Sequence, residues 1–567
     1  MLDLLIRDAK VVDGTGNPGY TAHVGVKEGK IALISRSDDL PEAARTIEAR
    51  GLVLAPGFVD MHTHTEYTIL CHNHGITSLK AGVTTEVMGM CGYSIFPVNE
   101  TIRQEAHARM AGLSQVSQSE VGEIDWRDLA GWLDKVEHVG TGINVLQYAG
   151  HGGIRAYVMG KEGEGGEKVI PAKEQLDKMK DVVLQCMEQG AFGLSSGLNY
   201  APGRNAITEE LIELGKVVSS FGGSYISHIR SEDEHLAWSC SELIDICRHT
   251  GMRGSVTHHK AFGKENWGKV HHTTYLIDQA REDGVDVMCD FYPWEYAAES
   301  NIGTSFYTDF ELSRRDSAEL RGWLTDEASW QSLKTRLKQT GAKEALATTE
   351  RSRQLAAHGV LASAGGRRQD STFIVHAPAY PELCGLSIRE ATRGLGFADD
   401  TLEACRKLYL DNDGYCYVAG GKIWEQDLRH LVRYSRSAIS TDSWTMERAP
   451  DLARPGMSSH PRAYGSFARV LGQYSRDESL ITLEDAVRKM TSLPASFIGL
   501  RKRGLIQEGY WADITLFNPE NVANLATFDN PFVYPAGINY VIVNGEVAVD
   551  DGRPQYTKSG KVLRFER

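Results

Sequence analysis

The stretch GFVDMHTHTEYT, residues 57–68, decides the fold, because a short apolar run ends there in two histidines one residue apart. Side chains of a β-strand alternate between its two faces. His62 and His64 must therefore point the same way, while Met61 and Thr63 point the other way. The sequence thus predicts two nitrogen donors side by side at the end of a buried strand.

The composition restricts the class of protein. The 567 residues are 41% hydrophobic and 24% charged, as is ordinary for a soluble globular enzyme with a large core. A net charge of −14 argues against nucleic acid or an anionic membrane as a main partner, because both require clustered Lys and Arg. No apolar run reaches the ~18 residues of a membrane span, and the first residues lack the pattern of a signal peptide. Nine irregularly spaced cysteines indicate reduced thiols, so we expect a cytoplasmic protein.

Short apolar runs alternate with amphipathic segments along the chain, which is the pattern of βα units around a parallel sheet. Eight runs can be proposed as strands: 57–64, 84–90, 143–150, 191–197, 223–229, 254–260, 285–292 and 437–442. A helix-like stretch follows most of them, for example 172–190, which ends on the capping glycine Gly190. Eight such units predict the α/β class and a closed (β/α)8 TIM barrel.

The two ends of the chain have a different pattern from the middle. Residues 1–55 and 497–567 contain β-type runs with glycine-centred turns, and we expect them to pair into one small β-domain beside a barrel of residues 56–496. An insertion of about 300–430 separates the seventh and eighth predicted strands. A structureless loop of that length is improbable, so the insertion should be folded and could cover the barrel mouth.

The chemistry of a (β/α)8 barrel lies at the C-terminal ends of its strands. The predicted strand ends carry six residues of metal-ligand type: His62, His64, Cys91, His228, His258 and Asp442. Zn²⁺ favours these nitrogen, sulfur and oxygen donors, and ligands converging from several strands would leave a position for water. Polarised by the metal, that water could attack a carbonyl, with Asp442 as general base and proton shuttle.

Each of these residues also has a plainer interpretation. A single histidine near a strand end is more often a hydrogen-bonded structural residue than a ligand, and Cys91 alone would be a small buried hydrophobe. The coincidence of all six at strand ends favours the metal site. In the triplet 258–260, a period of two places His258 and Lys260 on one face and leaves His259 to packing. The glycine-rich GEGGE at 163–167 follows no strand, so we interpret it as a turn and not a phosphate loop.

Several motifs together carry a family resemblance that spans nearly the whole chain. GFVDMHTHTE after a β-rich N-terminus resembles the amidohydrolase superfamily. MCGYS, AFGLSSGLNYAPG, ISHIRSE, VTHHKAFGKENWGK and SSHPRAYGSFARVL are similar to the N-acyl-D-amino-acid deacylase (D-aminoacylase) family. The resemblance implies a tightly held zinc ion on Cys91, His228 and His258. It also implies a second, weaker or partly occupied position on His62, His64 and Asp442.

The resemblance further implies residues that contact the substrate. Arg462 of the HPR motif and Tyr200 match family positions that bind the amino-acid carboxylate, and an arginine fork suits a carboxylate well. Lys260 matches a family lysine expected to orient the site, and Tyr292 aligns with a family site tyrosine to within one residue. Packing at a strand end is the alternative for both tyrosines. The sequence departs from the family at STDSW (440–444) and YPWEYAAES (292–300), which add bulk near the pocket and leave substrate preference open.

Together these observations predict a zinc-dependent hydrolase that cleaves the amide of a small-molecule N-acyl amino acid. The D configuration is implied by the resemblance and not by any spacing. One alternative is hydrolysis of a cyclic or other small amide at the same site. An alternative of another class is a non-catalytic amidohydrolase-like scaffold, which the retention of all six ligand positions disfavours. The sequence leaves the oligomeric state and the number of bound metals open.

Overall fold

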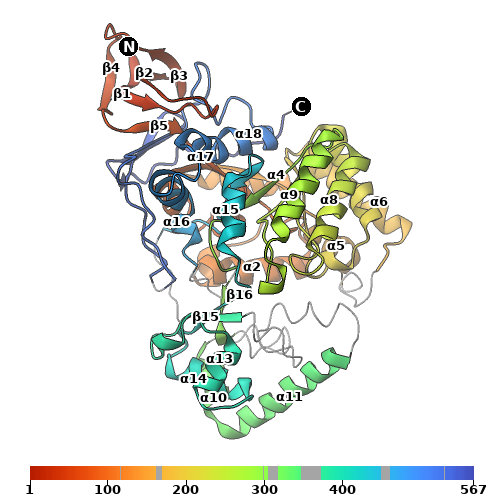
Figure 1. Ribbon diagram of the computed structural model, residues 1–567. Helices are drawn as coiled ribbons and strands as arrows, with labels where there is room; N and C mark the ends of the chain where they lie inside the picture. Colours follow the sequence, from red (N-terminus) through yellow and green to blue (C-terminus); the bar gives the residue numbers. More distant parts are fainter. Residues whose placement is uncertain are drawn as a thin grey trace.

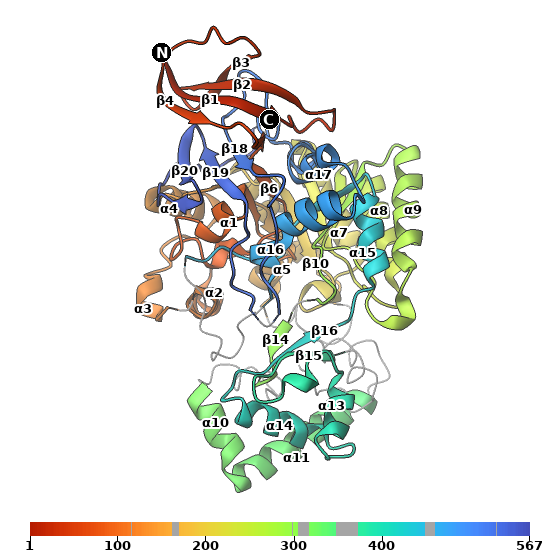
Figure 2. The same cartoon turned by 60° about the vertical axis from the view of Figure 1, so that its left-hand side comes forward.

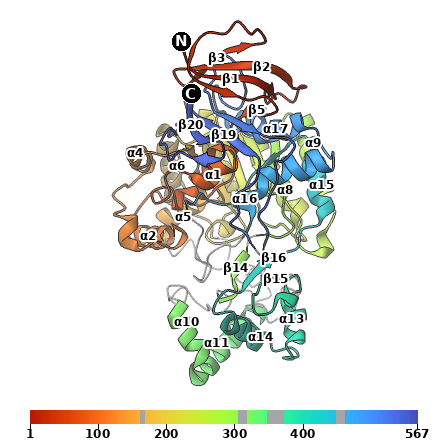
Figure 3. The ribbon, with the colours of Figure 1, turned by 90° about the vertical axis from the view of Figure 1, so that its left-hand side faces the viewer.

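The computed structural model describes residues 1–114, 116–160, 169–297, 299–303, 317–346, 372–447, 460–528 and 530–566. The turn expected at 163–167 lies outside these ranges. Figure 1, Figure 2 and Figure 3 show the described chain as three parts in a row. A β-sheet made by the two chain ends lies at one end, a ring of strands and helices lies in the middle, and an inserted segment lies at the other end.

Eight parallel strands form the middle part. They are β6 (Phe58–Asp60), β7 (Val83–Met88), β8 (Asn144–Gln147) continued by β9 (Ala149–Gly150), β10 (Gly193–Gly197), β11 (Ser224–His228), β12 (Arg253–Val256), β13 (Val287–Phe291) and β17 (Ser437–Ile439). Strands β6, β7 and β8 pair in that order, and β9 to β13 and then β17 pair in a second run. A bridge between Thr63 and Ser443 connects the ends of β6 and β17, so the pairing returns to its start.

Side chains fill the space inside these strands. One buried cluster includes a residue from each of six strands: Val59, Val87, Leu146, Ile226, Met288 and Ala438. Alternate residues of a strand face the same side, so these six strands send apolar side chains into the centre and the neighbouring residues outward. The centre is therefore a packed core that supports the strand ends from below.

A helix follows each strand and packs outside it (Figure 1). These helices are α1 (Ile76–Lys80), α4 (Leu129–Val139), α6 (Lys173–Glu188), α7 (Thr208–Phe221), α8 (Leu236–Thr250), α9 (Lys269–Glu282), α15 (Glu425–Arg433) and α17 (Leu483–Met490). Helix α6 buries Met179, Val183 and Cys186 along one face, as the 3.6-residue period requires. It ends before Gly190, which has the expected left-handed φ of 103°. This alternation of strands and helices confirms the α/β class.

The terminal sheet joins the beginning and the end of the chain. Its strands are β1 (Leu2–Val11), β2 (Tyr20–Lys27), β3 (Lys30–Ser35), β4 (Ala43–Glu48), β5 (Val53–Pro56), β18 (Ile514–Phe517), β19 (Ile538–Val543), β20 (Glu546–Asp550) and β21 (Arg553–Pro554). The order is β21-β20-β19-β18-β5-β1-β2-β3, with β4 beside β1. The antiparallel pair of β5 and β18 is where the two chain ends meet.

The inserted segment leaves the ring after β13 and returns before α15. It contains β14 (Glu299–Asn301), α10 (Ser317–Thr325), α11 (Glu327–Leu346), β15 (Thr372–His376), α13 (Ile388–Gly394), α14 (Thr401–Asp411) and β16 (Tyr417–Gly420). Its antiparallel sheet, in the order β14-β16-β15, covers a hydrophobic cluster of its own. The Tyr296 ring lies 5.8 Å from that of Phe373, and the Tyr296 carbonyl is bonded to His460, two residues before Arg462. The root of the insertion therefore adjoins one of the expected site residues.

All nine cysteines lie within the described ranges, and none forms a disulfide. The helices in these ranges include none that is long and apolar enough to cross a membrane.

Candidate metal centre

Three of the six expected ligands lie just past strand ends and have left-handed backbones. Cys91 follows β7, His258 follows β12 and Asp442 follows β17, with φ values of 57°, 35° and 50°. Such values are uncommon for residues with a side chain and persist only where the surrounding structure holds them. A Cβ on the next residue, Gly92, would lie 2.7 Å from the backbone nitrogen of Gly197. Glycine therefore allows the turn after Cys91 to pack closely against β10.

His62 and His64 point the same way, as their spacing predicts. Their Nε2 atoms lie 3.2 Å and 3.4 Å, respectively, from the same carboxylate oxygen, Asp442 Oδ1. The backbone N–H of Asp442 donates to the His62 carbonyl at 3.0 Å, which holds the ends of β6 and β17 together. The His62 side chain is fully buried, and those of His64 and Asp442 are 12% and 11% exposed.

The thiol of Cys91 lies between these residues and two further histidines. Its Sγ is 3.3 Å from His62 Nε2, 3.5 Å from His258 Nε2 and 3.8 Å from His228 Nδ1. His258 Nε2 and His228 Nδ1 are 2.9 Å apart. The structure thus brings all six expected ligands together in two groups that share Cys91. The first group is Cys91, His228 and His258, and the second is His62, His64, Asp442 and the shared Cys91.

Charges in this centre favour an anionic thiol and an anionic carboxylate. Burial raises the pKa of the Cys91 thiol, but His62 and His258 outweigh it and hold that pKa well below its ordinary value. Burial also raises the pKa of the Asp442 carboxyl, whereas Arg462 and His62 bring it well below its ordinary value. A thiolate, a carboxylate and imidazoles are the donors that Zn²⁺ prefers, so the donor set fits zinc.

Two residues that the sequence analysis did not select contact His62. Thr257 Oγ1 is hydrogen-bonded to His62 Nδ1, and Asp290 Oδ1 lies 3.7 Å from the same nitrogen. Asp290 Oδ1 also accepts hydrogen bonds from the His258 backbone N–H at 3.0 Å and from Ser440 Oγ at 2.7 Å. Partners on the second ring nitrogen orient a metal-binding imidazole, so these contacts fix the direction of His62.

Lys260 lies on the same side as His258 and is accompanied there by Glu232, another residue that the sequence analysis missed. Lys260 Nζ is 2.8 Å from His258 Nδ1 and 2.5 Å from Glu232 Oε1, and Glu232 Oε1 is 2.9 Å from His258 Nδ1. Burial raises the pKa of Glu232, but Lys260 lowers it overall. His259 turns away, with its Nε2 bonded to Thr273 Oγ1 in α9. Lys260 therefore lies beside His258 and His259 away from it, as expected, although the triplet lies past the end of β12 and strand alternation is not the cause.

Arg462, at the start of α16 (Arg462–Arg469), reaches the carboxylate of Asp442. Its Nη1 donates to Asp442 Oδ2 at 2.6 Å, and its guanidinium carbon lies 5.0 Å from the centroid of the Tyr292 ring. Lys260 Nζ is 5.5 Å from the same centroid. We call Arg462, Tyr292 and Lys260 the Tyr292 wall, which borders Asp442 and His258.

Tyr200 lies beside Cys91 and His228. Its hydroxyl donates to the Cys91 carbonyl at 2.7 Å, and its ring centroid is 5.2 Å from that of His228. A Cβ on Gly197 would lie 2.4 Å from this hydroxyl, so glycine leaves the space that the contact needs. Tyr93, which the sequence analysis did not select, stacks on Tyr200 at 5.3 Å.

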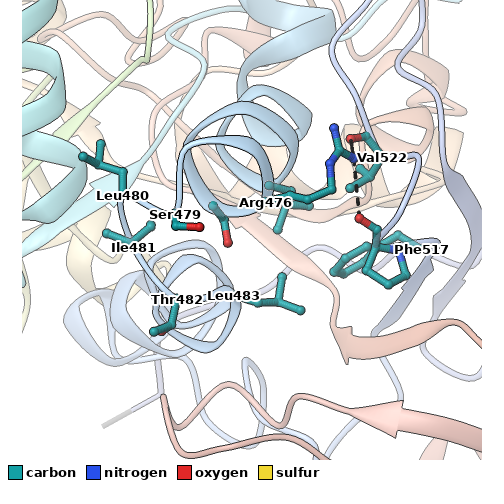
Figure 4. A pocket seen from close by; sticks show the side chains of 11 residues that line it. Arg476, Ser479, Leu480, Ile481, Thr482, Leu483, Phe517 and Val522 are labelled. Carbon is teal, nitrogen blue, oxygen red and sulfur yellow. Dashed lines mark hydrogen bonds between the residues drawn. The ribbon is translucent and has the colours of Figure 1, made fainter.

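A separate pocket lies between the π-helix η8 (Val470–Asp477) and the segment after β18. Its volume is about 470 Å³. Figure 4 shows its lining, in which Arg476 donates a hydrogen bond to the Val522 carbonyl at 2.7 Å. None of the expected site residues lines it, so this pocket is distinct from the candidate metal centre.

Known proteins resemble the chain over its whole length. The profile of the amidohydrolase family matches residues 45–259 and 451–549. A D-aminoacylase of Alcaligenes xylosoxydans xylosoxydans is 32% identical over 566 residues, which cover 99% of this chain and 97% of the relative.

Solved structures of N-acyl-D-amino-acid deacylases also match the chain over its whole length. A crystal structure of an N-acyl-D-glutamate deacylase from Bordetella bronchiseptica, complexed with zinc and a phosphonate mimic of the tetrahedral intermediate, is 29% identical. The match covers 99% of both chains with a TM-score of 0.73. A D-aminoacylase structure concerned with its binuclear metal centre, with one-metal activation and second-metal attenuation, is 28% identical over 100% of both chains, with a TM-score of 0.74. The chain therefore belongs to the amidohydrolase family, among its D-aminoacylases.

Proposed function

We propose that this protein is a zinc-dependent hydrolase of N-acyl-D-amino acids, which it cleaves at the amide bond to a carboxylate and a free amino acid. The observation that carries the proposal is the buried Cys91 thiol, which lies within 3.8 Å of nitrogens from three histidines. By name, the D-aminoacylase and N-acyl-D-glutamate deacylase relatives act on this substrate class.

The two ligand groups would hold zinc with unequal affinity. Cys91, His228 and His258 would bind one ion tightly, and His62, His64 and Asp442 would bind a second ion weakly with the shared thiol. When bound, zinc supplies a Lewis acid for the scissile carbonyl and makes a water molecule nucleophilic near neutral pH. The second group would bind zinc more weakly because Arg462 already balances part of the charge of the Asp442 carboxylate.

Asp442 is the residue placed to move protons. Its Oδ2 is held by Arg462, whereas its Oδ1 faces His62 and His64, so Oδ1 is the atom available to the reaction. We assign it the role of general base toward the attacking water and then of general acid toward the leaving amine. The cationic neighbour keeps this carboxyl ionised at neutral pH before the reaction starts.

The Tyr292 wall would bind the amino-acid carboxylate. Arg462 offers a planar fork of N–H donors that suits two charge-assisted hydrogen bonds, and Lys260 adds a second positive charge beside it. The two cations lie 5.0 Å and 5.5 Å from the centroid of the Tyr292 ring. Tyr200 would contact the substrate from the side of Cys91 and His228.

We also propose how the architecture serves this site. The eight strands would act as a (β/α)8 barrel whose C-terminal strand ends carry the ligands. Residues 1–55 with 497–567 would form a separate β-domain beside residues 56–496, and the insertion of about 300–430 would border the mouth. A cytoplasmic location, expected from the cysteine usage, stays a prediction.

The proposal is tested by a hydrolysis screen on paired D and L N-acetyl amino acids with zinc present, together with metal analysis of the purified protein. Stoichiometric zinc and hydrolysis of the D members are the expected results. Protein without stoichiometric zinc would indicate a scaffold. Activity confined to cyclic amides would show that the substrate is a cyclic amide and not an N-acyl amino acid, and the assignment of the metal chemistry would remain.

A further inference from the structure

A cation on α2 (Glu100–Ser114) approaches the metal centre through aromatic rings. The guanidinium carbon of Arg109 lies 4.2 Å from the ring centroid of Tyr93 and 4.4 Å from that of Tyr67. Tyr93 in turn stacks on Tyr200, and it forms an edge-to-face pair with His64 whose ring centroids are 5.9 Å apart. We call Tyr67, Arg109, Tyr93 and Tyr200 the Tyr93 wall, and it ends at the ligands.

The cations of the two walls differ in what balances their charge. Arg462 pairs with Asp442 at 2.6 Å, and Lys260 pairs with Glu232 at 2.5 Å. In the part of the chain that the structure describes, no carboxylate forms an ion pair with Arg109. Among the described side chains, the positive charge of the Tyr93 wall therefore has no carboxylate paired with it.

The surroundings of Arg109 make it suited to an anionic ligand. The Glu66 carboxylate acts on the charge of Arg109 electrostatically and over a longer range. It accepts a hydrogen bond from the Gly89 N–H and lies 3.7 Å from His64. Arg109 is an exposed residue whose guanidinium is partly desolvated, so part of its side chain is open to a ligand. Two aromatic faces replace part of the water around its guanidinium, and an anion there gains more than at an open surface.

We propose that Arg109 binds a second carboxylate of the substrate, beyond the one assigned to Arg462. This inference rests on the proposed function and narrows its substrate class to N-acyl amino acids that carry two carboxylates. The second carboxylate can belong to the amino-acid side chain or to the far end of the acyl chain. Arginine presents the same forked donors to either source.

The position of the two walls supports this assignment. The Tyr292 wall borders Asp442 and His258, whereas the Tyr93 wall borders His64 and, through Tyr200, His228. A substrate whose amide lies at the ligands and whose α-carboxylate lies at Arg462 has its remaining groups free to follow the Tyr93 wall. The tyrosine rings offer apolar surface to its methylenes, and Arg109 offers a charge to its end.

The test compares substrates that have the same shape and differ in charge. For the side chain, N-acetyl-D-glutamate is compared with N-acetyl-D-glutamine. For the acyl chain, N-succinyl-D-leucine is compared with its terminal amide. In the zinc-loaded wild type we expect higher kcat/KM for the charged member of at least one pair. Arg109→Met should lower kcat/KM for that member by about 10- to 100-fold, with a change of less than about 2-fold for the neutral member.

Two further variants separate recognition from structure. Arg103→Met removes the same charge from the same helix at a position paired with Glu100, and it should leave both substrate ratios unchanged. Arg109→Lys keeps a cation between the rings and should restore part of the preference. Inhibition by D-glutamate relative to D-glutamine, measured in wild type and Arg109→Met, gives a second readout that does not depend on turnover of a charged substrate.

The outcomes distinguish this inference from the proposed function. Equal losses on charged and neutral members in Arg109→Met would show that Arg109 only braces α2, and would overturn the inference while the hydrolase assignment stood. A wild type without preference for either charged member would do the same. A wild type that hydrolyses no N-acyl amino acid would overturn the proposed function and this inference with it.

Discussion

The two ligand groups share one thiol and differ in the charges around them. In the first group, the partners behind His258 are the Glu232 carboxylate, which strengthens the imidazole as a donor, and Lys260, which pairs with that carboxylate. In the second group, the partner of Asp442 is Arg462, a cation that competes with any metal for the same carboxylate. We therefore propose that the first group is the stronger site for a divalent cation and that the carboxylate of the second transfers the proton.

The largest effect is expected from the residue that both groups share. Cys91→Ala removes the thiolate from each, so bound zinc and hydrolysis should both be lost. Metal analysis and activity assays on the same preparation measure this. Cys71→Ala, at a half-buried cysteine outside both groups, is the matched control and should keep full zinc. Full zinc and wild-type turnover in Cys91→Ala would remove the thiol from the centre.

A smaller loss, in rate only, should follow from the carboxylate of the second group. Asp442→Asn keeps the shape of the side chain but cannot accept the proton of water, so kcat should fall by ~10²- to 10⁴-fold. The zinc on Cys91, His228 and His258 should remain, as measured by metal analysis. Loss of this tightly bound zinc would make Asp442 a principal ligand and would erase the difference between the two groups.

Much of the framework of this centre was predictable because it depends on local pattern. Strand period places His62 and His64 together, and apolar runs mark the strand ends where Cys91, His258 and Asp442 lie. The observed first strand, β6, has only three residues, whereas the predicted strand covers 57–64. The histidines lie beyond β6, where backbone hydrogen bonds from Thr63 to Val87, from His64 to Ser443 and from Asp442 to His62 hold the segment.

The supporting residues were not predictable in the same way. Glu232 and Asp290 lie near expected strand ends, but no spacing tells which carboxylate turns toward a ligand and which faces solvent. Tyr93 and Arg109 meet only because α2 folds back over the segment after β7, a long-range contact with no periodic signal. The ion pair of Arg462 with Asp442 was likewise not predictable, although the family resemblance of the HPR motif selected Arg462 as a substrate contact.

Replacement of Arg462 should lower activity and at the same time strengthen zinc binding by the second group. Arg462→Met should lower kcat/KM for N-acyl amino acids by ~10²-fold, because the substrate carboxylate loses its charge-assisted hydrogen bonds. The same variant frees Asp442, so the second zinc should bind more tightly in a metal titration. Arg469→Met, on the same helix with its cation over the Trp294 ring, is the control. Weaker binding of both metals would mean that Arg462 supports the centre structurally.

The smallest expected effect comes from Glu232, and it isolates the first group. Glu232→Gln preserves the shape and one hydrogen bond but removes the charge behind His258 and leaves Lys260 without its counter-ion. Residues that orient a metal-binding histidine in this way usually contribute 10- to 100-fold in affinity, so the first zinc should bind more weakly by about that factor. The second group has no contact with Glu232 among the described residues and should keep its affinity. Competition with a chelator measures both, with Glu234→Gln as the exposed control nearby and a melting curve to verify the fold. A parallel loss at both sites would show that the two groups act as one centre, and the contrast in their neighbouring charges would then not determine which ion binds first.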